Sequence, residues 1–281
     1  MTFYIGATAI HYQGGFPNPL DLFDKRFLNQ VLPVSRTLEV RLREVDHLPI
    51  PEGEPVTMGW TRSWDMPAGE IRLYTMDVDK PYMLSIYHGD LVEILYESEG
   101  WKLHGKQFRP WFQIHLERAL LGNQALVLHS ASIIVNGKAI VFSAPSGTGK
   151  TTQTDLWHQY ADSVEDLNGD RTLLQKTEDG WYACGFPLYG GILRCEQRAV
   201  PIACIAIVRR AKTDFIRELT PVEKVSLLYS EITAPSSNPD AVCATMDLIT
   251  DFIMDNTVIE LNCTMERSAV DVLRDYLENG D

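Results

Sequence analysis

The stretch AIVFSAPSGTGKTTQTDLW, residues 139–157, constrains this chain more than any other part of its sequence. It begins as an apolar run typical of a β-strand, passes through a loop of small residues, and continues as a helix-like segment. Residues Ala144 to Thr151 fit the relaxed phosphate-loop pattern, in which Ala or Gly is followed by any four residues, Gly, Lys, and Ser or Thr. We therefore expect a strand–loop–helix unit within a mixed α+β (α/β) fold.

Each residue type in this loop has a physical task in binding phosphate. Gly147 and Gly149 let the backbone turn without a Cβ clash, so that successive N–H groups point at an anion. Lys150 is expected to contact the β- and γ-phosphates, and the Thr151 hydroxyl is expected to bind Mg²⁺. The alternative is an ordinary Gly-rich turn, which the strand–loop–helix context disfavours. The predicted nucleotide-binding residues are Ser146, Gly147, Thr148, Gly149, Lys150, Thr151 and Thr152.

Asp170 follows the turn Asn168-Gly169 and precedes the strand-like run RTLL. A carboxylate in such a place can hold Mg²⁺ or take a proton from a hydroxyl group, so the predicted metal ligands are Thr151 and Asp170. The alternative is a turn residue that only bonds its own backbone. The nearby Glu165 and Asp166 are interpreted as a solvated acidic turn.

Two further side chains complete the predicted catalytic set. His129 follows the run ALVL at a predicted strand end, where it can polarise a phosphate or tune a base; a packed core histidine is the alternative. Arg194 can neutralise phosphate charge, as can the pair Arg209-Arg210 after a buried strand, and a plain surface role is the alternative for each. The predicted catalytic residues are Asp170, His129, Lys150 and Arg194.

Residues 124–281 are predicted to alternate strands and helices. Asn136-Gly137 between two β-branched runs is a strong hairpin signal, and TEDG is predicted to join a second hairpin. The run 202–208 is predicted as a strand buried on both faces, with helices near 221–233 and 239–255 and a final helix after Glu266. Ser268 and Asp271 have the spacing of a helix capping box. The Gly-rich stretch 186–191 is predicted to be a turn that can wrap the acceptor or the nucleotide base, and a plain loop is the alternative.

Residues 1–123 are predicted to form a smaller β-rich unit that recognises the substrate. Alternating runs such as TLEVRLRE and EIRLYTMD indicate strands with one buried face, and Gly89-Asp90 is predicted to join two more. Three prolines in residues 49–55 indicate a loop. A helix is predicted from Arg109-Pro110 to Gly122-Asn123.

The composition narrows the possible partners and compartments. The net charge of −13 argues against a nucleic-acid partner, since such proteins normally carry a basic stripe. The sequence has no apolar run of about 18 residues and no secretion signal, so we expect a cytoplasmic protein without a membrane partner. Its five cysteines lack Cys-x-x-Cys spacing and are interpreted as reduced thiols.

The order of these features resembles the HPr kinase family, part of the phosphoenolpyruvate-carboxykinase-like P-loop group. The resemblance covers about residues 125–265 and is carried by LHSASIIVNGKAIVFSAPSGTGKTT, LNGDRTLL, CGFPLYGG and VPIACIAIV. It implies a kinase core of that type for residues 124–281, with ATP and Mg²⁺ bound by Lys150 and Thr151. It also implies that His129 matches the family's strand histidine and that Asp170 matches the aspartate that deprotonates an acceptor serine.

The sequence departs from the family at one carboxylate. The family has two adjacent aspartates; Asp170 matches the second, and Gly169 stands in place of the first. Metal binding is then expected to depend on Thr151, Asp170, water or another acid. The Gly-rich signature of the phosphorylase direction has no counterpart, so the chain is more similar to divergent members that resemble kinases for a serine in ribosomally made peptides, such as lasso-peptide precursors.

Three functions stay open at this point. The first is an ATP- and Mg²⁺-dependent kinase that phosphorylates a hydroxyl, with serine of a peptide or protein as the expected acceptor. The second keeps the fold but acts on a small molecule. The third is a non-catalytic nucleotide-binding or sensing protein, for which Gly169 is the best argument. The acceptor, the choice between ATP and GTP or another donor, and the formation of a homo-oligomer are not decided by the sequence.

Overall fold

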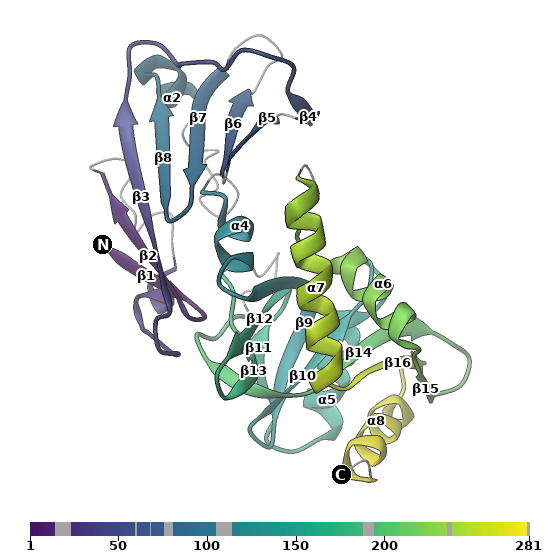
Figure 1. The fold of residues 1–281 in the computed structure, drawn as a ribbon. Coiled ribbons are helices and arrows are strands. Elements are labelled where there is room, and N and C mark those ends of the chain that lie inside the picture. Colours follow the sequence, from purple (N-terminus) through teal and green to yellow (C-terminus); the bar gives the residue numbers. More distant parts are fainter. Residues whose placement is uncertain are drawn as a thin grey trace. The chain divides into compact units, whose positions relative to one another are not determined.

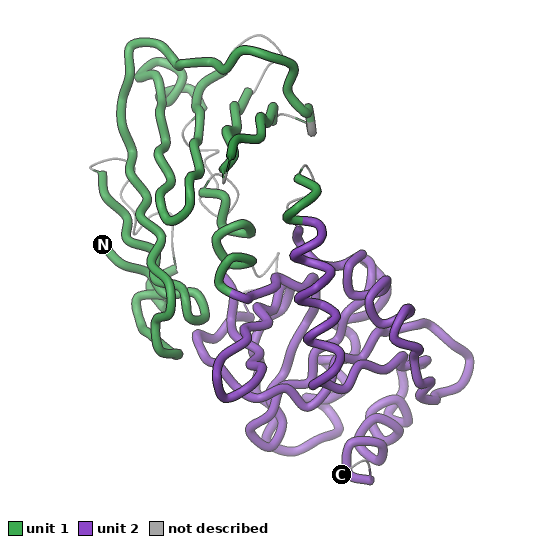
Figure 2. Tube along the Cα trace, in the orientation of Figure 1, with its two compact units in different colours: residues 1–123, 235–241 green, residues 124–234, 242–281 purple. Residues whose placement is uncertain are grey.

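The computed structural model describes residues 1–14, 24–59, 61–67, 69–75, 81–104, 114–187, 194–234 and 238–279. The chain divides into two compact units, Met1–Asn123 with Pro235–Ala241, and Gln124–Ala234 with Val242–Asp281 (Figure 2). Each unit contains its own eight-stranded sheet, and helices accompany both sheets, so the mixed α+β class is confirmed (Figure 1). None of the helices in these ranges has the length and apolar character needed to span a bilayer.

The sheet of the first unit has the strand order β1-β2-β3-β8-β7-β6-β5-β4, with β3 parallel to both β2 and β8. The alternating runs of the sequence form its central strands, and Leu38 and Val40 of β3 are completely buried. Residues 49–55 form a loop, as predicted. The elements are β1 (Thr2–Ile5), β2 (Thr8–Gln13), η1 (Lys25–Leu28), β3 (Arg36–Glu44), β4 (Val56–Met58), β5 (Thr61–Met66), β6 (Gly69–Thr75), β7 (Pro81–His88), β8 (Leu91–Tyr96), α2 (Ser98–His104) and α4 (Leu116–Leu121).

The helix predicted before the boundary is only partly covered by the structure. The proposed start at Arg109-Pro110 lies outside the described residues. Its later part is the short helix α4, which is followed by Gly122 at the C-cap, as predicted.

A buried polar cluster lies inside the first unit. His115 is fully buried; its Nε2 lies 2.7 Å from the Ser85 hydroxyl and its Nδ1 lies 3.4 Å from a Glu70 carboxylate oxygen. Arg72 donates to both Glu70 oxygens at 2.8 Å. Burial alone raises the pKa of Glu70, but the bonds from His115 and Arg72 and the charge of Arg72 outweigh burial and hold that pKa well below its usual range. Burial also lowers the pKa of His115.

Acidification is expected to destabilise the protein through this cluster. Because the pKa of His115 and that of Glu70 are both lowered in the folded chain, the unfolded chain takes up a proton first as the pH falls, at about pH 6.5 for His115 and at about pH 4.3 for Glu70. Both differences make the unfolded state bind more protons, so the free energy of unfolding falls by up to about 1.4 kcal/mol per pH unit for each group. Urea titrations at pH 7.5 to 5.5, read by circular dichroism, measure the part of this slope that His115 contributes.

His115→Asn is the matched variant, because asparagine tolerates the left-handed backbone that His115 adopts at φ 51°. The variant is expected to be less stable at every pH, because it loses buried hydrogen bonds, but to have a shallower pH slope in this range. Equal slopes in the two proteins would show that His115 does not carry the acid sensitivity.

The second unit contains a sheet of order β10-β9-β12-β13-β14-β16-β15, and β11 pairs with β9. Because β10 also pairs in parallel with β14, the strands β9, β10, β14, β13 and β12 form a closed ring of pairings. The elements are β9 (Ala125–Val135), β10 (Lys138–Ser143), α5 (Lys150–Tyr160), β11 (Glu165–Asn168), β12 (Arg171–Thr177), β13 (Gly180–Cys184), β14 (Ala199–Arg210), β15 (Phe215–Glu218), α6 (Pro221–Glu231), α7 (Pro239–Asp255), β16 (Val258–Cys263) and α8 (Arg267–Asn279).

Strand β9 changes partners along its length. Residues Ala125–His129 pair with β12, and Ser130–Val135 pair with β10. The hairpin between β9 and β10 turns at Asn136-Gly137, both with positive φ, as the sequence predicts. His129 therefore lies in the middle of an eleven-residue strand, and its prediction as a strand end was wrong. The polar residues that follow it, Ser130 and Ser132, are buried and share hydrogen bonds with Thr172, which keeps the strand continuous.

One main core of the second unit lies between its sheet and two helices. Phe142 of β10, Ala206 of β14 and Leu261 of β16 pack with Trp157 of α5 and Leu273 of α8, and all five are buried. The strand predicted over residues 202–208 is fully buried from Cys204 to Val208. This packing fixes α5 against the strand that precedes it in the chain.

Two local predictions in this unit were wrong. Glu165 and Asp166 belong to strand β11 rather than to an acidic turn, and Asp166 bonds His158 at 2.9 Å. Ser268 lies within α8 and donates to Asp214 at 2.6 Å instead of capping the helix. In both cases the partner comes from another element, which local spacing does not reveal.

Candidate active site

The phosphate-loop sequence forms the junction between β10 and α5. The loop leaves β10 after Ser143, and α5 begins at Lys150. Gly147 and Gly149 have φ values of 76° and 126°, which side chains rarely tolerate, and a Cβ at either position would meet nothing within 4 Å. These glycines are therefore required by the backbone turn and leave open space beside the loop. The first N–H groups of a helix at such an open turn can bind an anion.

Ala144 is accommodated without difficulty in the place where phosphate loops usually have glycine. Its side chain is buried in the core between β10 and α5. Its carbonyl oxygen accepts a hydrogen bond from Lys150 Nζ at 2.7 Å.

Lys150 is the buried cation of this junction. Besides Ala144, its Nζ lies 3.1 Å from Nε2 of His129. An ammonium group has three N–H donors, so a third is left for a further oxygen. Burial lowers the pKa of Lys150, while the charges of Glu231 and Asp170 oppose this shift.

His129 is held between Lys150 and a carboxylate that the sequence did not indicate. Its Nδ1 lies 2.8 Å from Oε2 of Glu231, the last residue of α6. Since a carboxylate accepts, Nδ1 carries the proton, and Nε2 is left to accept from Lys150. The chain after α6 joins β9 through the bridge Leu128–Ile232 and the bond from Thr233 N to Val127 O at 2.9 Å, which brings Glu231 to His129.

Asp170 lies on the same side of His129 as Lys150. Its Oδ1 is 3.8 Å from His129 Nε2, and its side chain is 34% exposed, so solvent and a ligand can reach it. The turn that carries it does not need the carboxylate: Asn168 Oδ1 accepts from the backbone N–H of Asp170 and Arg171 at 3.0 and 2.9 Å. The structure thus brings Lys150, His129 and Asp170 together, and adds Glu231.

Arg194 is directed elsewhere. Its guanidinium donates to Asp155 of α5 at 2.7 Å and lies 3.6 Å from Asp166 of β11. Its backbone carbonyl accepts from the Gly169 N–H at 2.9 Å. In this arrangement Arg194 supports the turn before Asp170 and the flank of α5, and two carboxylates already balance its charge.

Arg210 contacts the phosphate loop directly. It donates to the Thr148 carbonyl at 3.0 Å and to the Gly147 carbonyl, whereas its neighbour Arg209 pairs with Glu260. The sequence suggested both arginines without distinguishing them. Arg209 and Arg210 have different partners because they are adjacent on β14, and successive side chains of a strand point to opposite faces.

A cavity of about 380 Å³ adjoins the loop. Its walls combine polar groups of the loop and α5 with apolar side chains from β14 and the end of β16. Gln153 lies in it with an amide oxygen that has no hydrogen-bond partner among the described residues. The lining residues are Thr148, Gly149, Thr152, Gln153, Val208, Arg210, Ala211, Cys263, Thr264 and Met265.

The remaining predicted residues fall into two groups. Ser146 is exposed, and Thr151 and Thr152 are partly buried in the first turn of α5. The Gly-rich stretch predicted to wrap an acceptor lies mostly outside the described residues, from position 188 onward.

Within the described ranges no group of three or more His, Cys, Asp or Glu side chains could hold a metal ion, and the five cysteines are free thiols.

Glu231 is the residue of this cluster that the sequence did not indicate. It is 102 residues from His129, and it ends a helix whose surroundings show no motif. Only the bridge between the chain after α6 and β9 explains its position.

No family model matches the chain, and no curated protein shows significant similarity to it.

Proposed function

We propose that this chain is an ATP- and Mg²⁺-dependent kinase that transfers the γ-phosphoryl group to a hydroxyl, with serine of a peptide or protein as the acceptor. One observation carries the proposal. The loop contains two glycines with positive φ and ends in Lys150. Nε2 of His129 lies close both to Lys150 Nζ and to the partly exposed carboxylate of Asp170. A phosphate-binding cation and a candidate base therefore lie within one cluster, which is what phosphoryl transfer requires.

The residues fit a nucleotide in a consistent way. The loop N–H groups and the third N–H of Lys150 are donors for phosphate oxygens. The cavity beside Thr148 and Thr152 has a volume suited to the rest of a nucleotide. Thr151 and Asp170 would hold Mg²⁺, which needs few protein ligands when phosphate and water supply the others. Mg²⁺ would neutralise charge on the transferred group.

The chemical step follows from the same groups. Asp170 takes the proton of the acceptor hydroxyl while the oxygen of that hydroxyl forms a bond to the γ-phosphorus. The bond between that phosphorus and the β–γ bridging oxygen breaks, and ADP leaves. Glu231 keeps the Nδ1 proton on His129, so that Nε2 continues to accept from Lys150 and holds it at the loop.

The experiment is phosphoryl transfer from labelled ATP by the purified chain with Mg²⁺. Acceptors are serine-containing peptides, the same peptides with alanine at that serine, and a panel of hydroxylated metabolites. Label on the serine peptides alone supports the proposal. Label on metabolites alone would assign the chain to small-molecule kinases of the same reaction type. ATP binding without transfer to any acceptor would assign it to non-catalytic nucleotide binders.

Arg210→Met is expected to weaken nucleotide binding by about tenfold, because the loop loses two hydrogen bonds from a charged donor. The measurement is calorimetric titration with ATP and Mg²⁺.

Arg209→Met is the matched control for this prediction. Arg209 is adjacent, equally exposed on the strand end, and pairs with Glu260, which Arg217 also binds at 2.8 Å. Its nucleotide affinity is expected to stay within about twofold of the native value. Equal losses in both variants would mean that general charge, and not the loop contact, determines affinity.

A further inference from the structure

Arg171 belongs to the same face of the sheet as the candidate active site. It is the first residue of β12, and it pairs directly with His129 across the antiparallel strands β12 and β9. Side chains of directly opposed residues lie on the same face of a sheet, so Arg171 and His129 project to the same side. That side is where Lys150 and Asp170 approach His129.

Two observations show how close Arg171 lies to these groups. Its Nε is 3.7 Å from Oδ2 of Asp170, which is an ion-pair distance but too long for a hydrogen bond. Burial lowers the pKa of Lys150, and the charge of Arg171 lowers it further, so the two cations lie near each other. Two neighbouring cations with unused N–H donors favour an anion that both can contact.

Most donors of the Arg171 guanidinium are unused. Among the described residues its one hydrogen bond runs from Nη1 to Thr233 Oγ1 at 2.8 Å, whereas a guanidinium has five N–H groups. Thr233 belongs to the segment after α6 that also brings Glu231 to His129, so the same chain pairing fixes both side chains. The Arg171 side chain is 26% exposed, which gives a ligand access to it.

The charges around Arg171 leave room for a phosphate group. Arg194 is balanced by two carboxylates, and Arg210 donates to carbonyl groups of the loop. In the cluster itself, Asp170 and Glu231 offset the charges of Lys150 and Arg171. Asp170 is also the proposed ligand of Mg²⁺, and the two charges of that ion make the cluster positive when nucleotide and metal bind together.

We propose that Arg171 binds the γ-phosphoryl group of the nucleotide through the unused N–H groups of its guanidinium. This inference rests on the proposed kinase function and adds the residue that meets the transferred group. An acceptor oxygen held at Asp170 must come within about 3–3.5 Å of the γ-phosphorus, which brings the phosphoryl oxygens to a guanidinium beside Asp170. Arg171 only donates hydrogen bonds, and no covalent bond forms or breaks at it. It takes the role that the sequence suggested for Arg194.

The test compares the affinities of the full chain for ATP and for ADP, each with Mg²⁺, by calorimetric titration. Arg171→Met is expected to weaken ATP binding at least about tenfold, the usual effect of losing hydrogen bonds to a charged group. Its affinity for ADP is expected to stay within about twofold of the native value, because ADP lacks the γ-phosphoryl group. Arg171→Lys keeps the charge but not the planar fork, so it is expected to recover part of the ATP affinity. In the phosphoryl-transfer assay, Arg171→Met is expected to lower kcat about a hundredfold.

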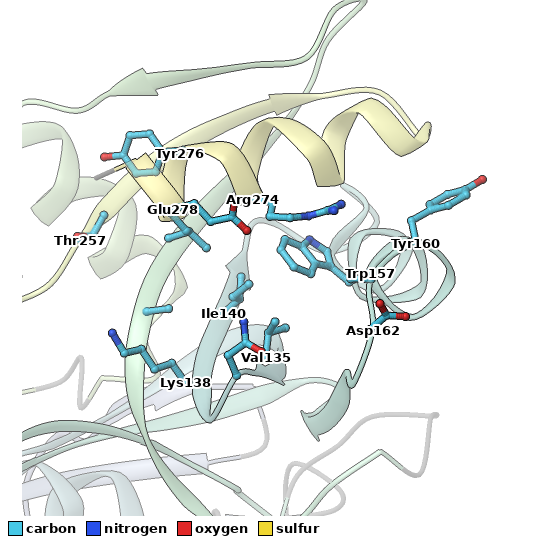
Figure 3. Close-up of a pocket in the computed structure, with 14 residues that line it drawn as sticks. Val135, Lys138, Ile140, Trp157, Tyr160, Asp162, Thr257, Arg274, Tyr276 and Glu278 are labelled. Carbon is cyan, nitrogen blue, oxygen red and sulfur yellow. The ribbon is translucent and has the colours of Figure 1, made fainter. Parts of the chain in front are cut away.

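Arg274→Met is the matched control. Arg274 is 33% exposed, and its one side-chain hydrogen bond among the described residues runs to Asp271 at 2.8 Å. It lines a cavity of about 490 Å³ beside the last turn of α5, at Trp157 and Tyr160 (Figure 3). The phosphate loop lies at the other end of this eleven-residue helix, about 16 Å away. Both nucleotide affinities of Arg274→Met are expected to match those of the native chain.

Two results would overturn this inference while leaving the kinase function in place. Equal losses of ATP and ADP affinity in Arg171→Met would assign Arg171 a structural role. Native ATP affinity in that variant, with a raised KM for the peptide, would place Arg171 at the acceptor instead.

The reverse case separates the two proposals. A native chain that transfers no phosphate, but whose preference for ATP over ADP depends on Arg171, would contradict the kinase function and support the γ-phosphoryl contact. A native chain that binds neither nucleotide would overturn both.

Discussion

Lys150→Met is expected to reduce phosphoryl transfer by about a hundredfold to a thousandfold and to weaken ATP binding at least about tenfold. The native Nζ is fixed by the Ala144 carbonyl and by His129, so its remaining N–H is oriented before any ligand arrives. Methionine fills the same buried space without a charge or a donor. Calorimetry with ATP and Mg²⁺ measures the affinity, and a labelled-phosphate assay measures the transfer.

Lys176→Met is the matched control for Lys150→Met. Lys176 lies in the same unit and pairs with Asp251 at 2.6 Å, but it does not contact the loop. Its affinity for ATP should match that of the native chain. Thermal unfolding of both variants separates a local effect from a loss of folding. Native ATP affinity in a folded Lys150→Met protein would contradict the assignment of the loop.

Asp170→Asn is expected to lower kcat by about a hundredfold to ten-thousandfold and to weaken binding of ATP with Mg²⁺ by less than about tenfold, since Thr151, phosphate and water still hold the metal. Asparagine has the same shape but cannot take the acceptor proton. The turn should be preserved, because Asn168 holds the Asp170 backbone N–H, and the Asp170 carbonyl accepts from Ser130 at 3.0 Å. Steady-state kinetics with a peptide that the native chain phosphorylates give both values.

The control for this second variant is Asp166→Asn. Asp166 is an acidic residue four positions earlier, and it bonds His158 instead of the His129 cluster. It should keep nearly native kcat. If Asp170→Asn also keeps native kcat, another group takes the proton; if it loses ATP affinity instead, Asp170 acts chiefly in binding.

The parts of this fold that the sequence predicts are those that depend on near neighbours. Asn136-Gly137 specifies its hairpin because both residues tolerate positive φ, and Gly147 and Gly149 specify the loop for the same reason. The alternating run of β3 predicts that strand because Leu38 and Val40 share one buried face, whereas in β6 both Leu73 and Tyr74 are buried and the strand has no exposed face there. For the candidate site, this reasoning located Lys150 and Asp170.

The parts that could not be predicted depend on contacts between distant segments. Glu231 reaches His129 only because the chain after α6 pairs with β9. Arg194 carries a charge suited to phosphate, but Asp155 and Asp166 from two other elements bind it. His129 was expected at a strand end because a polar residue after an apolar run usually indicates one, whereas buried serines continue β9.

The change of partner along β9 also limits how this protein can evolve. His129 is the last residue of β9 paired with β12, and the next residue begins the pairing with β10. The direction of the His129 side chain therefore depends on the register of β9 with each of these two strands. Inserting one residue within β9 would turn His129 to the opposite face of the sheet. The length of β9 on either side of His129 is therefore constrained, whereas turns outside the strand do not alter this register.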